Sequence, residues 1–221
     1  MATKAAKSTT AGRKVFRRSD TSNLNNRATF TFDTDPSRPG VTRITLPEKS
    51  IWTPGRHWHE QHVEYFRVIQ GRVLVRLGNT SQIATPAHGP VRIEKFVIHD
   101  FMRADRDKSD DEKDVEDAVV EEWTDPADGI KHVFFRNIFS ILKDAQSYWG
   151  RWTYLQALYV AATYDDFIEV MPGRASYLTT HLLYGCVRGL GSLLGLRPWY
   201  EEYTPEHLRP VARGLNILKD E

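Results

Sequence analysis

HWHEQHVEYFRVIQG, residues 57–71, is the stretch of sequence that decides how the rest of the chain is interpreted. On a β-strand, residues two apart point to the same side, so His57 and His59 project together while Trp58 points the other way. Glu64 follows a short turn and begins the next β-rich run, from which its carboxylate can reach both imidazoles. Imidazole and carboxylate groups are ordinary ligands of transition-metal ions. The segment therefore predicts a metal site built between short strands.

A third imidazole is expected from a separate strand, and His99 is placed to supply it because it follows the β-rich residues 93–98. By alternation, Phe101 and Arg103 share its side of the strand. Three imidazoles and one carboxylate leave positions open on an octahedral ion, which suits a redox metal or an ion that polarises a substrate oxygen. Structural zinc sites are usually closed and rich in thiolates, whereas this chain has a single cysteine.

These residues resemble the first motif of the cupin superfamily, which reads His-x-His, three or four residues, Glu, six residues, Gly. His57, His59, Glu64 and Gly71 satisfy each spacing. His99 matches the histidine of the second cupin motif.

The chain departs from the family pattern at three places. Ile51 stands where the first motif has a glycine, Glu94-Lys95-Phe96 replaces the Pro-x-Gly of the second motif, and Arg103 replaces its asparagine. The resemblance covers about residues 42–103.

The resemblance implies a mainly β protein, α+β overall, with a cupin β-barrel (a double-stranded β-helix, or jelly roll) and a C-terminal helical extension. It implies one divalent metal ion, with Fe(II) favoured and Zn, Mn or Ni as alternatives. The expected metal ligands are His57, His59, Glu64 and His99.

Glu64 and Arg103 are the expected catalytic residues. A buried arginine on the ligand side needs an anionic partner. Arg103 therefore either grips a carboxylate or enolate of the substrate or pairs with an interior acid. Trp52, Phe66 and Phe101 either line an apolar substrate pocket or pack as ordinary core.

The chain as a whole is also similar to short cupin-domain proteins of fungi and bacteria, some of which lie among natural-product biosynthesis genes. This similarity implies a metal-dependent enzyme acting on a small organic molecule, and an oxidase or dioxygenase of specialised metabolism is favoured because the ligand set suits Fe(II). An isomerase or cyclase that uses the metal as a Lewis acid is the first alternative. A non-catalytic small-molecule binder is the second.

The order of patterns along the chain indicates strands first and helices last. The segments are interpreted as a disordered basic tail (1–27), the barrel (28–130) and a helical extension packed on it (131–221). The β-prone runs are 29–32, 41–46, 64–68, 72–77, 91–101 and 118–123. Residues 69–71 are interpreted as a hairpin turn, residues 79–90 as a polar loop, residues 105–117 as a solvated charged loop, and 133–142, 154–162 and 178–194 as helical.

Charge and composition narrow the partners. The formal net charge is +1, which argues against a nucleic-acid partner. One cysteine, Cys186, cannot form an internal disulfide and fits a reducing compartment. Residues 1–18 hold six Lys and Arg and no Asp or Glu, so they are interpreted as a basic tail of a cytoplasmic protein, with a mitochondrial transit peptide as the alternative. The glycine-rich residues 178–196 favour a core or homodimer contact over contact with a membrane.

The remaining histidines are not expected to be ligands. His62 lies in the turn between ligands and is expected to be exposed and inert. His88 is expected to be solvated in a loop. His132, His181 and His207 are expected to be ordinary surface or core residues.

Overall fold

The computed structural model describes residues 22–23, 28–33, 38–106, 116–145 and 149–217. The described chain divides into two compact units. The first runs to Ala127 and also includes Phe167–Glu169, and it contains the strands. The second comprises Asp128–Asp166 and the residues from Val170 onward, and it contains the α-helices.

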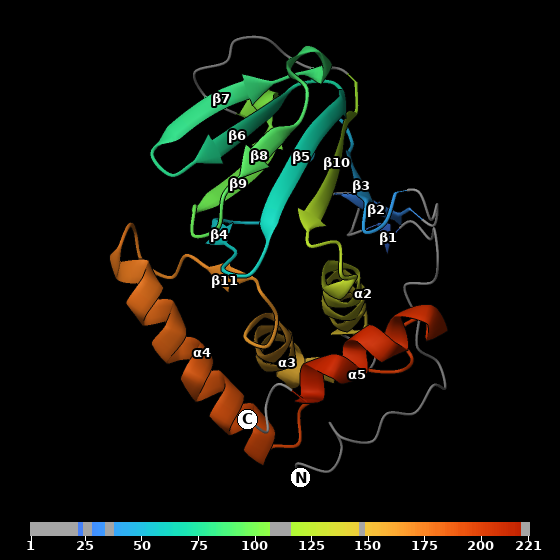
Figure 1. Cartoon of the computed structure of the whole chain (residues 1–221), viewed down its shortest axis with the longest axis vertical. Coiled ribbons are helices and arrows are strands. Elements are labelled where there is room, and N and C mark those ends of the chain that lie inside the picture. Colours follow the sequence, from blue (N-terminus) through green and yellow to red (C-terminus); the bar gives the residue numbers. More distant parts are fainter. Residues whose placement is uncertain (1–21, 24–27, 34–37, 107–115, 146–148, 218–221) are drawn as a thin grey trace. The chain divides into compact units, whose positions relative to one another are not determined.

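The strands of the first unit form two antiparallel sheets. One sheet has the strand order β1-β2-β3-β10-β5-β8 and the other has the order β11-β4-β9-β6-β7. In Figure 1, β6 and β7 lie at the left and β10 and β3 at the right of this unit. The strands are β1 (Ser22–Asn23), β2 (Thr29–Phe32), β3 (Thr42–Leu46), β4 (His57–Trp58), β5 (Val63–Gln70), β6 (Val73–Leu77), β7 (Thr80–Ala84), β8 (Val91–Ile93), β9 (His99–Arg103), β10 (Ala118–Asp125) and β11 (Phe167–Ile168).

Alternation along the strands separates the interior from the outer surface. On β5, Glu64, Phe66 and Val68 are buried, whereas Tyr65 and Arg67 are partly exposed. The two antiparallel sheets, together with the helices of the second unit, confirm the predicted α+β class. Closure into a barrel and the packing of the helical extension on it stay predictions.

The predicted hairpin at residues 69–71 is wrong. β5 pairs with β10 and β8, whereas β6 pairs with β7 and β9, so the chain passes from one sheet to the other at this turn. Gly71 has φ +74°, and a Cβ there would lie 3.0 Å from the Cα of Ala118. A glycine is needed because the turn passes directly against β10 in a left-handed conformation.

Two further predictions are corrected within the strands. The polar residues expected as a loop contain β7 and a short 3-10 helix, η1 (Pro86–His88). The run expected as a single strand over 91–101 is divided into β8 and β9, which belong to different sheets. Phe96 lies between them with φ +64°, a backbone conformation that is uncommon outside glycine.

The predicted tail and charged loop fall largely outside the described residues. Within 1–27, Ser22–Asn23 forms β1 and pairs with Thr29 and Phe30 of β2, while residues 1–21 and 24–27 are outside the described part. Within the charged segment, Ala104–Arg106 forms the 3-10 helix η2, and residues 107–115 are likewise outside it.

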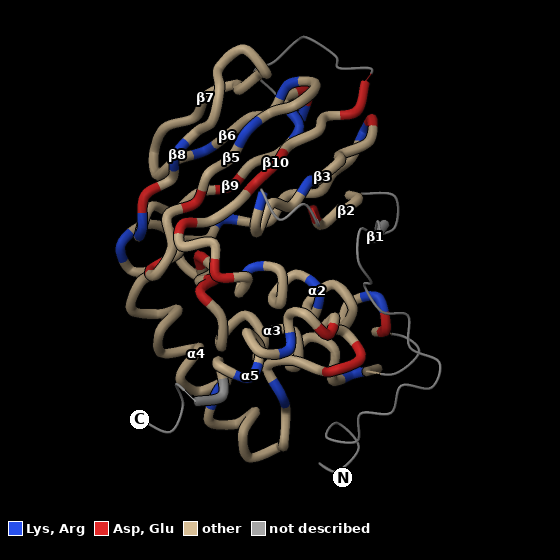
Figure 2. Tube along the Cα trace, turned by 45° about the vertical axis from the view of Figure 1, so that its right-hand side comes forward, with Lys and Arg blue, Asp and Glu red and all other residues tan. Residues whose placement is uncertain are grey.

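Acidic and basic positions lie side by side on β3, β10 and β5 (Figure 2). Glu121 of β10 accepts hydrogen bonds from Arg38 (2.6 Å), Arg43 (2.7 Å) and Arg67 (2.6 Å). Burial raises the pKa of Glu121, but the bonds from Arg38, Arg67 and Arg43 outweigh it and lower the pKa to about 2. This cluster ties the loop before β3 to three neighbouring elements through one carboxylate.

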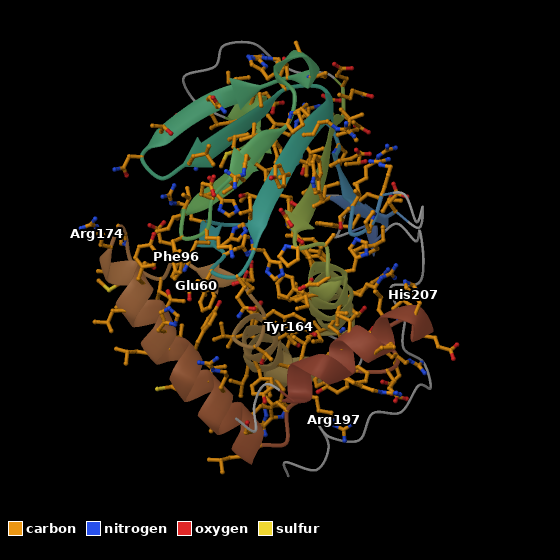
Figure 3. The ribbon with its side chains drawn as sticks, in the orientation of Figure 1. Glu60, Phe96, Tyr164, Arg174, Arg197 and His207 are labelled. Carbon is orange, nitrogen blue, oxygen red and sulfur yellow. The ribbon has the colours of Figure 1, made fainter. Side chains whose placement is uncertain are left out.

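The second unit is helical, as predicted past residue 131. Its α-helices are α2 (Ile130–Lys143), α3 (Thr153–Ala161), α4 (Ala175–Leu193) and α5 (Arg209–Ile217), with 3-10 helices η4 (Gly150–Trp152) and η5 (Glu206–Leu208). Figure 3 labels Tyr164, Arg197 and His207 within this unit. Sequence patterning did not predict α5.

Close packing in the helical unit is visible at Gly191. A Cβ on Gly191 of α4 would lie 2.0 Å from a ring carbon of Tyr159 of α3, so only glycine fits there. At Gly185 and Gly189 nothing lies within 4 Å of such a Cβ among the described residues. The glycines of α4 therefore differ in role, and one of them makes the predicted core contact. Among the described residues, no helix is long and apolar enough to cross a membrane.

Candidate metal centre

Three residues of one short segment, 57–64, meet His99 from a later strand in the interior of the first unit. His57, His59, Glu64 and His99 each present a ligand atom, and these atoms all lie within 4.8 Å of one another. The four residues are buried, with exposed fractions of 7%, 7%, 2% and 1%. Each residue predicted as a metal ligand is therefore placed in one cluster.

Strand pairing explains how the cluster forms. His57 of β4 lies directly opposite His99 of β9, and their ring centroids are 4.2 Å apart. Glu64 comes from β5 in the other sheet, and its Oε1 lies 3.7 Å from Nε2 of His99. His59, just after β4, places its Nε2 3.0 Å from the other oxygen of Glu64. The site thus draws ligands from both sheets.

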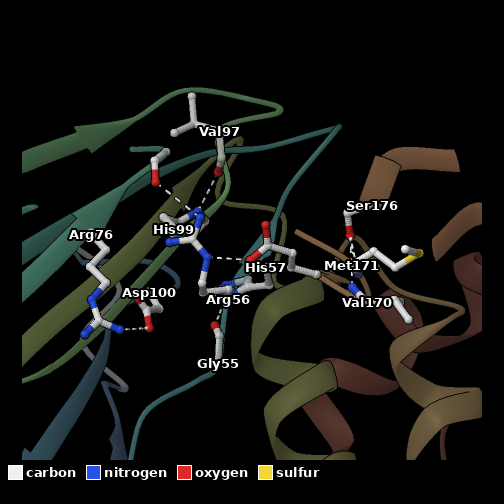
Figure 4. A network of polar contacts seen from close by, with 12 residues as sticks. Gly55, Arg56, His57, Arg76, Val97, His99, Asp100, Val170, Met171 and Ser176 are labelled. Atoms are coloured by element: carbon white, nitrogen blue, oxygen red, sulfur yellow. Dashed lines mark hydrogen bonds and ion pairs between the residues drawn. The ribbon is translucent and has the colours of Figure 1, made fainter. Parts of the chain in front are cut away.

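Backbone carbonyls orient two of the imidazoles. The Nδ1 of His57 lies 2.8 Å from the carbonyl oxygen of Gly55, and the Nδ1 of His99 lies 2.8 Å from that of Val97 (Figure 4). A carbonyl oxygen can only accept, so each Nδ1 carries the proton and donates. In the neutral ring Nε2 is then unprotonated, and this nitrogen can bind a metal ion.

The donor atoms fit a divalent ion. The Nε2 of His99 is buried and has no hydrogen-bond partner among the described residues, and a buried polar atom of this kind calls for an explanation such as a bound ion. Imidazole nitrogens and carboxylate oxygens bind such ions at about 2.0–2.2 Å, which places two ligands of one ion about 3–4 Å apart. The spacing in the cluster is close to this range.

Electrostatics keep His57 neutral. Burial lowers the pKa of His57 well below its ordinary value, and the neighbouring His99 and His59 lower it further, whereas Glu64 and the Gly55 carbonyl raise it. A neutral imidazole is the form that binds metal. The protein environment therefore favours the ligand-competent state at neutral pH.

The turn between β8 and β9 holds His59 through the main chain. The amide of Phe96 donates to the carbonyl oxygen of His59 at 2.7 Å. Phe96 is 52% exposed. Glu60, the residue after His59, accepts a hydrogen bond from the Trp58 indole at 2.9 Å. Sequence reasoning missed this contact, since no residue type marks a backbone bond of this kind.

Arg103 lies on the interior side of β9 and is completely buried. Its guanidinium contacts Asp105 at 3.1 Å and donates to the carbonyl oxygens of Leu46 (3.1 Å) and Glu116 (2.8 Å). Of the two interpretations of Arg103, these contacts favour pairing with an acid. Its role as a substrate anchor stays a prediction.

Aromatic rings continue the interior face beyond the ligands. Phe101 of β9 contacts Phe66 of β5 at 4.7 Å between ring centroids and Trp52 at 5.8 Å. Trp52 in turn meets Phe30 at 5.3 Å. The three residues expected at an apolar pocket are therefore contiguous, in the same interior as the cluster.

Of the other histidines of this unit, His62 differs from expectation. It was expected to be exposed, but only 5% of its surface is accessible, whereas the neighbouring Gln61 is exposed. His88 is exposed, as expected. Neither belongs to the four-residue cluster.

Known proteins share sequence with this chain at a low level. The oxidoreductase OpS7 of Beauveria bassiana is 25% identical over 184 residues, which cover 72% of this chain and 59% of that protein. The epoxidase atD of Aspergillus terreus is 28% identical over 161 residues, covering 69% of this chain and 47% of that protein. This chain therefore spans about half the length of the curated relatives it matches. No family model matches the chain.

A solved structure with a partial likeness is a sugar phosphate isomerase from a cupin superfamily, from Silicibacter pomeroyi. It is 15% identical, with a TM-score of 0.35, and the match covers 51% of this chain and 67% of that chain. The resemblance to cupins that the sequence predicted is confirmed at the site itself, where the histidines and glutamate of the first motif meet His99 in one buried cluster.

Proposed function

We propose that this chain is a cupin-type, metal-dependent oxidoreductase that acts on a small organic molecule. The observation that carries the proposal is the buried set of three imidazoles and one carboxylate with its donor atoms within 4.8 Å of one another. The names of the relatives, an oxidoreductase and an epoxidase, support an oxidative reaction.

The proposed ligands are His57, His59, Glu64 and His99, and the proposed ion is Fe(II). When bound, Fe(II) supplies redox chemistry at the coordination positions that four protein ligands leave open. A site with three imidazoles and one carboxylate suits iron, whereas structural zinc sites are usually rich in thiolates. Zn, Mn and Ni remain the alternatives for the same donors.

The chain's own groups perform three tasks in this proposal. The carbonyls of Gly55 and Val97 hold two imidazoles with Nε2 facing the cluster. Glu64 supplies the negative charge that offsets a divalent ion in a buried site. Trp52, Phe66 and Phe101 form an apolar surface in the same interior, which suits a largely apolar substrate and excludes water.

Glu64 also has a role to play in proton transfer when the metal acts only as a Lewis acid, as in the isomerase or cyclase alternative. Arg103 is proposed as the residue that keeps β9 in place, with substrate contact as its alternative role. We further propose that the protein is cytoplasmic and acts in specialised metabolism. Its proposed partner is a small molecule and not a nucleic acid. Its proposed assembly is a homodimer formed through residues 178–196.

Metal analysis and a gas probe test the proposal together. Protein purified without chelator is expected to contain about one divalent ion per chain, because the described residues form one such ligand set. Fe(II)-loaded protein exposed to nitric oxide is expected to give the electron paramagnetic resonance signal of an iron-nitrosyl, because nitric oxide occupies open positions on the iron. The His207→Ala variant, which loses an exposed imidazole of the helical unit, is the matched control and keeps both properties.

The alternatives correspond to different outcomes. Metal binding without the nitrosyl signal, and without oxygen uptake in the presence of candidate small molecules, favours an isomerase or cyclase. Protein that contains no metal and binds none on addition contradicts the enzyme proposal and favours a metal-free binder.

A further inference from the structure

The strand that carries the first ligand is very short. β4 consists only of His57 and Trp58, and its pairing with β9 involves a single residue pair, His57 with His99. Two residues cannot maintain a strand by themselves. The position of His57 therefore depends on what lies along the other edge of β4.

That edge is occupied by β11, which comes from the chain between α3 and α4. Ile168 pairs with His57, and Phe167 pairs with Trp58. The Phe167 ring also stacks on the completely buried Trp58 ring, with centroids 5.4 Å apart and planes 17° from parallel. Both residues of β4 are thus held from the β11 side, whereas β9 holds only one.

The contact is extended by an ion pair directly beside the ligand. Glu169, the residue after β11, donates its amide to the carbonyl oxygen of Arg56 at 2.8 Å. Its carboxylate contacts Nε of Arg56 at 2.5 Å, and the side chains are 11% and 31% exposed. A further Arg56 nitrogen donates to the carbonyl oxygen of Gly78, after β6, at 3.2 Å. Arg56, the residue immediately before His57, therefore joins β11 to the β6–β7 turn.

Charge adds a second reason for the pair. Arg56 adjoins a ligand in sequence, and a guanidinium without a counter-ion at this place would repel a divalent cation. Glu169 supplies that counter-ion. Removing Glu169 alone should therefore disturb the site more than removing both charges.

We propose that Glu169 is a positioning residue for the metal centre, and that with Arg56 and β11 it sets the position of His57. This inference rests on the proposed metal site and extends it to a segment more than 100 residues away in the sequence, since the Arg56–Glu169 separation is 113 residues. Groups outside the ligands that orient them commonly change metal affinity about 10-fold to 100-fold when mutated.

The test measures Co(II) affinity by competition with a chelator, together with the visible absorption spectrum of bound Co(II). Glu169→Gln is expected to weaken Co(II) binding about 10-fold and to alter the spectrum, because His57 is no longer held in the same place. The Arg56→Met/Glu169→Gln double variant is expected to lose less affinity than Glu169→Gln. The charge-swapped variant Arg56→Glu/Glu169→Arg is expected to recover part of the loss.

The matched control is Glu48→Gln, which removes a carboxylate from the exposed Glu48–Lys49 pair of the same unit. The melting temperature of each metal-free variant separates general destabilisation from loss of the site, and Glu169→Asp is the milder variant if Glu169→Gln does not fold. Unchanged affinity and spectrum in the Glu169 variants overturn the inference, as does an equal loss in Glu48→Gln. If the wild-type protein binds Co(II) tightly and the Glu169 variants bind it equally well, the inference fails but the proposed function stands. If the wild-type protein binds no ion, both the inference and the proposed function are overturned.

Discussion

His57 and His99 lie directly opposite each other on adjacent strands. In each, Nδ1 donates a hydrogen bond to the carbonyl oxygen of the residue two positions earlier. Both bonds are 2.8 Å long. Each imidazole is thus oriented by the backbone immediately before its own strand. The pair consequently turns the two Nε2 atoms away from these carbonyl oxygens and toward the cluster.

The first prediction concerns the paired histidines of β4. The His57→Ala/His59→Ala variant is expected to contain no bound divalent ion, since two of the four ligands are lost. Elemental analysis of protein purified without chelator measures this. Stoichiometric metal that survives the double substitution would sink the site assignment.

His99 and Arg103 are expected to behave differently although they share one side of β9. His99→Ala should weaken metal binding about 10-fold or more, because even changes outside the ligands have effects of that size. Arg103→Met should leave metal content intact but lower the free energy of unfolding by about 3–5 kcal/mol, since it leaves Asp105 and two carbonyls without their buried partner. Urea denaturation and chelator competition separate the two effects.

Full affinity in His99→Ala would mean that the third imidazole comes from elsewhere. A metal loss in Arg103→Met comparable to that in His99→Ala would instead point to a direct part for Arg103 at the site. If Arg103→Met keeps its stability but no longer binds a small-molecule substrate, the substrate-anchor interpretation is supported.

A pH dependence is expected from Glu121. Its folded-state pKa of about 2 lies below the ordinary value of 4.5, so the carboxylate stabilises the fold above about pH 4.5 and loses this effect as the pH falls toward 2. The Glu121→Gln variant should be less stable at neutral pH and should lack that part of the acid sensitivity. Denaturation midpoints of both proteins at pH 3 to 7 measure the difference, and parallel curves would contradict it.

Gly71 and Gly78 provide a comparison between two left-handed glycines. Gly78→Ala meets nothing within 4 Å among the described residues, so it should cost only the backbone term, about 1–2 kcal/mol. Gly71→Ala should cost more, because its Cβ would lie 3.0 Å from the Ala118 backbone. If the two variants lose equal free energy of unfolding, β10 moves away from the new Cβ at residue 71 without a measurable cost in stability.

Local patterns predicted which residues cluster, because the positions of these side chains depend on alternation along the strands. The spacing of His57, His59 and Glu64 already implies which sides of their strands they occupy. The strands β2, β5 and β6 lie where the sequence has β-prone runs. Sheet membership was not accessible in this way. A glycine between two β-rich runs is typical of a hairpin, and nothing in residues 69–71 indicates that the chain changes sheets there.

Other elements escaped because their sequences lack a period. β7 reads as a polar loop because it is an edge strand with exposed Thr80, Ser81 and Gln82. β11 has two residues, too few for alternation to be recognised. His62 was expected to be exposed because turns usually are, but its side chain is buried while the adjacent Gln61 is exposed.

The origin of β11 determines where this chain can be divided. A fragment ending at residue 130 contains the ligands of the cluster and matches the predicted limits of the barrel, but it lacks Phe167, Ile168 and Glu169. Such a fragment would expose the edge of β4 and the Trp58 ring to solvent. A shortened protein meant to retain the site has to extend through residue 169, or to carry the β11 segment back as a separate peptide.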